Sequence, residues 1–157
     1  MKKLLKISSP LVIIVGIIMV VGGIWGVSFT YSNVVREKIT TPDDASIPGV
    51  LVRGPFTLKS QADIIRTHTL NSTNGKTFAE MPSKVPELDQ NGKPVLDENG
   101  ESIMVANTSR NIWITATTLI TALNFAIVAY AFSSFIILFG LVSVWVGLLF
   151  IFISRRH

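Results

Sequence analysis

The segment NIWITATTLITALNFAIVAYAFSSFIILFGLVSVWVGLLFIFIS, residues 111–154, contains no charged side chain, and Arg155-Arg156-His157 follow it. A second uncharged run, residues 11–31, lies near the start of the chain. Uncharged runs of this length are typical of helices that cross a membrane, because a charged side chain in the hydrocarbon core is costly. The two runs therefore predict a membrane protein whose central part is held at the bilayer by both of its ends.

Positive charge is concentrated at the two ends of the chain. Five of the 14 Lys and Arg residues lie outside the two runs, so those between them nearly balance the 10 Asp and Glu residues. Basic residues beside a span favour the cytoplasmic side, which predicts a plasma-membrane protein with both termini in the cytoplasm. The nearly neutral middle lacks the basic surface that nucleic acid requires. The absence of cysteine excludes disulfides and thiolate metal sites.

The first uncharged run predicts a transmembrane helix over residues 10–32. Pro10 suits the first position of a helix, where its missing N–H has no partner to lose. The run is about 31 Å long as a helix, against a hydrocarbon core of about 30 Å. The alternative is a cleaved signal peptide ending near Gly26-Val27-Ser28, which the length of the apolar run disfavours.

Gly22 and Gly26 form a G-x-x-x-G pair in this first helix. Small residues at this spacing let another helix approach closely, and the second span of the same chain is the expected partner. The alternative is that both glycines reflect only the high frequency of glycine in membrane helices.

The C-terminal run is twice as long as one span requires. Residues 112–153 would measure about 63 Å as one helix, so the run either folds back or stands half outside the membrane. No Gly, Pro, Asn or Asp lies between Phe132 and Ile136 to make a turn, and a fold-back would place Arg155 outside. We therefore predict one long helix, with an outer part at 109–128, a span at 129–153 and a cytoplasmic tail at 154–157. Polar residues form a stripe on its outer part: Asn111, Thr115, Thr117, Thr118, Thr121 and Asn124.

The residues between the spans, 33–128, predict a small extracytoplasmic α+β domain. Thr57 is a plausible N-cap for a helix over 58–70, in which Leu58, Ala62, Ile65 and Thr69 share one face. Two D-x-N-G motifs, at 89–92 and 97–100, favour type I′ turns, and the second predicts a small hairpin. Neither motif has the spacing of an EF-hand loop, so we expect turns and no calcium site.

Residues 37–81 contain a series of short motifs: Glu37-Lys38-Ile39-Thr40, Asp43-Asp44-Ala45, Val52, Gly54-Pro55, Thr57, Gln61-Ala62-Asp63-Ile64-Ile65, His68, Leu70 and residues 75–80. On these motifs the segment resembles a group of small actinobacterial two-span membrane proteins of unknown function. The resemblance implies two spans and an exported domain, and some members are labelled aromatic ring-opening dioxygenases. It ends after Pro82, where the two D-x-N-G turns look like an insertion. Among the residues of these motifs, the motif candidates are Asp43, Asp44, Gly54, Pro55, Asp63, His68, Gly75, Lys76 and Glu80.

The residues do not support dioxygenase chemistry. Non-haem iron is commonly held by two His and a carboxylate, but only His68 lies in the outer domain, because His157 ends the chain. We predict no catalytic residue, metal or cofactor. The expected function is a non-catalytic interaction protein of a cell-envelope or membrane complex, with the bilayer and a protein as partners and homo-oligomers possible. The alternatives are an enzyme around His68, Asp63 and Glu80, or an oligomeric channel built from the first helix and the Thr/Asn stripe.

Overall fold

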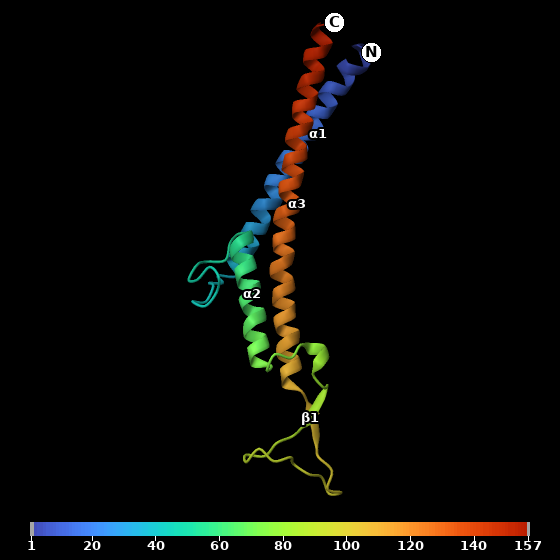
Figure 1. Ribbon diagram of the computed structural model, residues 1–157. Helices are drawn as coiled ribbons and strands as arrows, with labels where there is room; N and C mark the ends of the chain where they lie inside the picture. The colour runs from blue at the N-terminus through green and yellow to red at the C-terminus, as the bar shows by residue number, and fades with distance from the viewer. Residues whose placement is uncertain (1, 157) are drawn as a thin grey trace.

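The computed structural model describes residues 2–156 of the chain, and two long helices dominate it (Figure 1). Helices α1 (Lys2–Arg36) and α3 (Thr108–Arg156) run antiparallel, which places both chain ends at one end of the molecule. Between them come α2 (Pro55–Ser72), the 3₁₀ turn η1 (Phe78–Glu80) and the strands β1 (Lys84–Pro86) and β2 (Met104–Ala106). The protein is therefore mostly helical with one small sheet, and α1 and α3 are long and apolar enough to cross a membrane.

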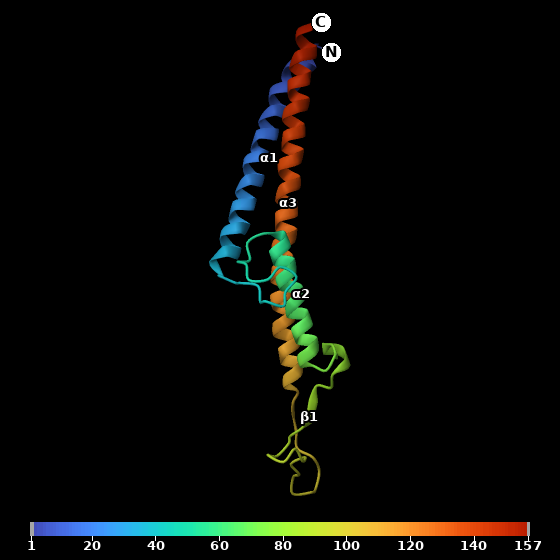
Figure 2. The same cartoon turned by 60° about the vertical axis from the view of Figure 1, so that its left-hand side comes forward.

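Helix α3 is continuous from Thr108 to Arg156, about 73 Å, so the C-terminal run does not fold back. This confirms the prediction of one long helix. The physical reason lies in the sequence between Phe125 and Gly140, which has no Gly, Pro, Asn or Asp to interrupt the backbone hydrogen bonds. The outer part of α3 extends well beyond the end of α1 (Figure 2).

Helix α1 begins at Lys2, so the predicted helix start at Pro10 is wrong. Pro10 lies inside the helix, where it removes one backbone N–H donor. The last turns of α3 run beside this segment, and Ser9 is buried there. Packing against α3 stabilises the helical conformation of these residues. At its other end α1 stops at Arg36, and Lys38 has a positive φ of 51° that turns the chain away.

The α1–α3 contact repeats every seven residues. The buried positions on α1 are Ser9, Gly16, Gly23 and Thr30. A Cβ atom on Gly16 would lie 2.7 Å from the carbonyl oxygen of Gly140, and one on Gly140 would lie 2.8 Å from that of Gly16. The two backbones therefore touch at this layer, which only glycine permits. A seven-residue repeat is the pattern of helices that wrap around each other with a left-handed twist.

The predicted Gly22–Gly26 pair is half right. A Cβ on Gly26 would lie 2.5 Å from Oγ of Ser133, so this glycine does face α3. A Cβ on Gly22 would meet no atom of a neighbouring segment of the described chain within 4 Å, whereas a Cβ on the adjacent Gly23 would lie 2.8 Å from the Ser133 carbonyl oxygen. The four-residue spacing in the sequence pointed to the wrong glycine, because the interface follows a seven-residue repeat.

Helix α2 packs along the outer part of α3 (Figure 1). It starts three residues earlier than predicted, with Gly54 as the N-cap and Pro55 at the first helical position. Thr57 sits at the third position of the helix, where its hydroxyl accepts the Gly54 N–H at 3.1 Å. The predicted inner face is confirmed: Leu58, Ala62 and Thr69 are buried and Ile65 is half-buried.

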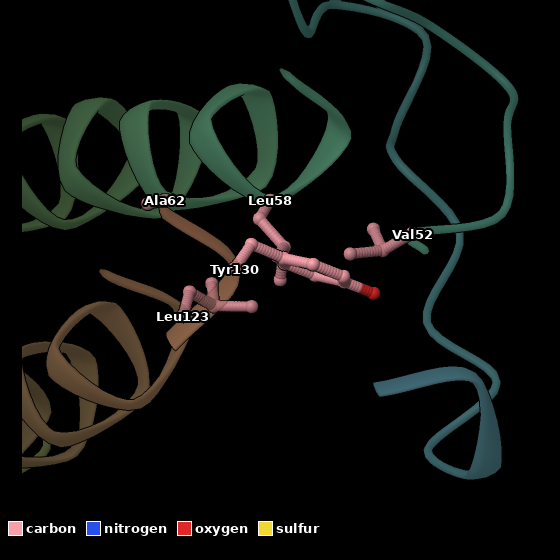
Figure 3. Close-up of a cluster of buried hydrophobic side chains, with 5 residues drawn as sticks. All are labelled: Val52, Leu58, Ala62, Leu123 and Tyr130. Carbon is pink, nitrogen blue, oxygen red and sulfur yellow. The ribbon is translucent and has the colours of Figure 1, made fainter. Parts of the chain in front are cut away.

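A small apolar core fixes the point where all these segments meet (Figure 3). Val52 of the loop after α1, Leu58 and Ala62 of α2, and Leu123 and Tyr130 of α3 pack together there. The Tyr130 hydroxyl donates a 2.7 Å hydrogen bond to the carbonyl oxygen of Arg53. This bond fixes the start of α2, with the charged Arg53, at the level of Tyr130 on α3.

Residues 84–106 form an arm beyond the outer end of α3 (Figure 1). Strands β1 and β2 pair antiparallel at its base, and a ring of three backbone hydrogen bonds follows. The Glu87 N–H donates to the Ile103 oxygen at 2.8 Å, Val95 donates to Glu87 at 2.8 Å, and Ile103 donates to Val95 at 2.9 Å. Glu87, Val95 and Ile103 follow one another at intervals of eight residues, and the two D-x-N-G motifs are also eight residues apart. The hairpin predicted around the second motif is confirmed, but the pairing with residues 84–87 was missed.

The two turns of the arm are alike, and neither is type I′. A type I′ turn needs a positive φ at the asparagine as well as at the glycine, and of these residues only Gly92 (φ 76°) and Gly100 (φ 82°) have one. In the first turn the Gly92 N–H donates to the Asp89 oxygen at 3.0 Å, which is typical of a type I turn followed by a left-handed glycine. Oδ1 of Asp89 accepts the N–H groups of Asn91 and Lys93, both at 2.8 Å, so the aspartate side chain stabilises the turn.

Candidate functional site

An open, mostly apolar groove lies between the outer end of α1 and the outer part of α3, and we call it the outer groove. Its volume is about 1000 Å³. Helix α3 forms the floor, α1 forms one wall, and Phe78 of η1 lies at the far end. The lining residues are Phe29, Thr30, Asn33, Val34, Phe78, Ile114, Thr117, Thr118, Thr121, Ala122, Phe125, Ala126 and Ala129.

The groove lies on the face of α3 that α2 leaves open. Residues Ala116 and Leu123 of α3 are buried under α2, whereas Thr118 and Phe125, two positions further along, are exposed. Two residues correspond to about 200° around a helix. Phe125, on this open face, is 73% exposed.

Arg110 contacts Phe78 at the far end of the groove, and Trp113 fixes the segment just before Phe78. The guanidinium of Arg110 lies 3.9 Å from the centre of the Phe78 ring, a favourable cation–π contact. The indole N–H of Trp113 donates to the Lys76 carbonyl oxygen at 2.7 Å and to Oγ1 of Thr73 at 3.1 Å. Since Trp113 is buried, these bonds fix the segment between α2 and η1 against α3.

Most polar groups in the groove are already satisfied. Thr30 donates to the Gly26 oxygen at 2.9 Å, and Thr118 donates to the Ile114 oxygen at 2.9 Å. Asn33 and Thr117 donate in the same way to the carbonyl four residues earlier in their own helices. The outer groove therefore offers methyl groups and aromatic rings, and few free donors, to whatever occupies it.

His68, the histidine of the outer region, pairs with Asp44. Its Nε2 lies 2.7 Å from Oδ2 of Asp44, which connects α2 to the loop after α1. The hydrogen bond with His68 lowers the pKa of Asp44 below its ordinary value. Both side chains are about half exposed or more. The pair joins two segments, which is a structural role that the sequence did not reveal.

The residues of the enzyme hypothesis do not meet. Asp63 forms an ion pair with Lys59 one turn away on α2, and it lies about 140° around the helix from His68. Oε2 of Glu80 accepts the N–H of Thr77 at 2.7 Å, which lowers the pKa of this carboxyl. Within residues 2–156 no hydrogen bond joins His68 to Asp63 or Glu80, and no group of three His, Cys, Asp or Glu residues is arranged to hold a metal.

The other motif candidates shape the backbone. Gly54 and Pro55 start α2. Gly75, with a φ of 76°, lies just after the end of α2, and its N–H donates to the Leu70 oxygen at 2.8 Å. The carbonyl of Lys76 receives the Trp113 indole N–H. Asp43 lies in the turn that the Ala45 N–H closes on the Pro42 oxygen at 3.1 Å. These motif candidates thus have structural roles in the outer region.

The sequence did not identify the outer groove. It did identify Thr117, Thr118 and Thr121 as part of a polar stripe, and these residues are on the groove floor. Phe29 and Phe78 belong to other segments, and nothing in the sequence shows that they face α3. No protein-family model, curated protein or solved structure matches this chain.

Proposed function

We propose that the chain is an integral membrane protein without catalytic activity, whose outer groove receives an apolar helix of a partner protein. Helices α1 and α3 are the two spans, both termini lie in the cytoplasm, and the region between them lies outside the plasma membrane. The protein then acts as an accessory or structural component of a membrane or cell-envelope complex. The outer groove is the observation that carries this proposal.

The charges around the helix pair support this orientation. Lys6 and Arg155 lie together at one end of the antiparallel pair. At the other end, the Tyr130–Arg53 hydrogen bond places a charged residue at the level of Tyr130. From Tyr130 to Ser154 α3 rises about 36 Å, which fits a core of about 30 Å with a modest tilt.

With the predicted spans at 10–32 and 129–153, most of the outer groove lies outside the bilayer, and Phe29, Thr30 and Ala129 lie at its inner edge. The groove starts at Ala129, one residue from Tyr130, and follows α3 outward to Ile114. Its apolar residues would then face water unless something covers them. Exposed apolar patches on a protein surface commonly mark sites of interaction.

The shape and chemistry of the groove favour a helix as the occupant. The 16 residues from Ile114 to Ala129 rise about 22 Å, or about four helical turns. Ala122, Ala126 and Ala129 are small residues along the floor, and such residues let another helix come close. Because the groove offers few free donors, it suits a helix whose own backbone is already hydrogen-bonded.

Site-directed photo-crosslinking in living cells tests this proposal. A photoreactive phenylalanine analogue replaces Phe125 in the groove, and the control replaces Lys59 on the exposed side of α2. We expect a discrete heavier adduct of the full chain from position 125 alone, containing another membrane protein by mass spectrometry.

Two results would contradict the partner helix. One is the absence of any protein adduct at position 125 while the chain is present in the membrane fraction. The other is an adduct of twice the mass of the chain, which would show that the groove receives a second copy.

A further inference from the structure

A second hollow lies at the opposite end of the molecule, between the first turns of α1 and the last turns of α3. Its volume is about 480 Å³. Lys6 of α1 and Arg155 of α3 both line it, so two cations from two helices face the same space. The other lining residues are Ser9, Pro10, Ile151 and Ser154. We call this hollow the basic pocket.

Neither helix carries an acidic side chain to balance these cations. No Asp or Glu occurs in residues 1–36 or 102–157. Along α1 the nearest one, Glu37, is about 46 Å from Lys6. Among residues 6–155, whose side chains the structure describes, the ion pairs all involve carboxylates of residues 37–63, at the outer side of the helix pair. Lys2, Lys3 and Arg156 add positive charge by sequence.

Two like charges that share a pocket repel each other, so an anion from outside the chain would stabilise the arrangement. The pocket lies where the apolar runs of both helices end, which is the level of the lipid headgroups if the helices span the bilayer. Basic pockets between membrane helices bind anionic headgroups. A guanidinium matches a phosphate with two parallel hydrogen bonds, and an ammonium adds a point charge.

We propose that the basic pocket binds the phosphate headgroup of an anionic phospholipid, with Lys6 and Arg155 contacting the same headgroup. The bound lipid then joins the end of α1 to the end of α3. This inference rests on the proposed membrane insertion and is independent of the outer groove. It assigns the basic end a binding role in addition to its role in orientation.

Native mass spectrometry of the full chain in mild detergent tests the site. The probes are phosphatidylglycerol, phosphatidylcholine and inorganic phosphate. We expect the chain to retain phosphatidylglycerol about tenfold better than phosphatidylcholine, and we expect the double variant Lys6→Gln/Arg155→Gln to lose that preference. The variant Lys84→Gln/Lys93→Gln removes the same charge from the arm and should retain it.

A conservative variant separates binding from folding. Lys6→Arg/Arg155→Lys keeps both charges and should retain the lipid, even if the glutamine variant is poorly folded. Equal retention of the two lipids, or unchanged retention in the glutamine variant, would overturn the proposal. Displacement of the lipid by millimolar inorganic phosphate would also overturn it, since the site would then be one for free phosphate. A chain that stays in the membrane fraction but shows no lipid preference contradicts this inference alone.

Discussion

The glycines of α1 show that the role of a residue in packing depends on the helix face that it occupies. Gly16 touches the backbone of Gly140, whereas the Cβ position of Gly22, six residues later, meets no atom of a neighbouring segment of the described chain within 4 Å. The two residues have the same chemistry and the same helical conformation, so any difference between them comes from the neighbouring helix.

Replacing Gly16 by alanine should destabilise the helix pair by about 1–3 kcal/mol, because the added methyl group has no space and α3 must shift. The matched control Gly22→Ala should leave the stability unchanged or slightly raised. Thermal unfolding of both variants in the same detergent checks this. Equal melting temperatures for the two variants would contradict the seven-residue contact repeat.

The Asp44–His68 pair gives a residue-scale prediction on pH. Since the folded-state pKa of Asp44 is lowered, the contact stabilises the fold above the ordinary value of 3.8 and is lost as pH falls through the lowered pKa. In His68→Ala the pKa of Asp44 should rise to its ordinary range, as measured by carboxyl NMR titration. Glu80, whose pKa the Thr77 N–H lowers, is the internal control and should not change. An unaltered Asp44 titration would rule out the pair in solution.

Among the secondary-structure elements, the arm depends least on the rest of the molecule. Its apolar residues Leu88, Leu96 and Met104 are exposed, so it has little core of its own. Its base is closed by Asn107, whose N–H donates to the Ser83 oxygen at 3.1 Å and whose Nδ2 donates to the Pro82 oxygen at 2.9 Å. The Asn107 side chain also accepts the Ser109 N–H at 3.0 Å and so caps α3.

Replacing residues 84–106 by two glycines should therefore change the melting temperature by less than about 2 °C. The substitution Asn107→Ala, which leaves the arm in place but removes the cap, should cost about 1 kcal/mol. Thermal unfolding of the two variants in detergent compares them. If the deletion destabilises the chain more than Asn107→Ala does, the arm contributes to the stability of the helices.

The elements that could be predicted from the sequence are those determined by residues close together in the chain. Features that depend on contacts between distant segments could not be predicted. The continuity of α3 follows from the absence of breakers near residues 132–136, and the inner face of α2 follows from its 3.6-residue period. The start of α1 was predicted wrongly because the helix continues through Pro10, where the last turns of α3 run beside it. The outer groove was not predictable, because it needs the relative placement of α1, α3 and Phe78.

At the scale of the whole molecule, the fold separates two hollows along its length. The basic pocket and the outer groove lie at opposite ends of the antiparallel helix pair, with the glycine contacts between them. The predicted two-span architecture requires that the arm and the chain ends lie on opposite sides of the membrane. The proposed function and the lipid site both depend on this arrangement.

Cysteine labelling tests this arrangement most directly, because the chain has no native cysteine and each single substitution gives one thiol. The variants are Lys93→Cys in the arm and His157→Cys at the C-terminus, and the reagent is a membrane-impermeant maleimide added to intact cells. The account predicts labelling of Lys93→Cys in intact cells and of His157→Cys only after permeabilisation. Labelling of His157→Cys in intact cells, or protection of Lys93→Cys, would contradict it.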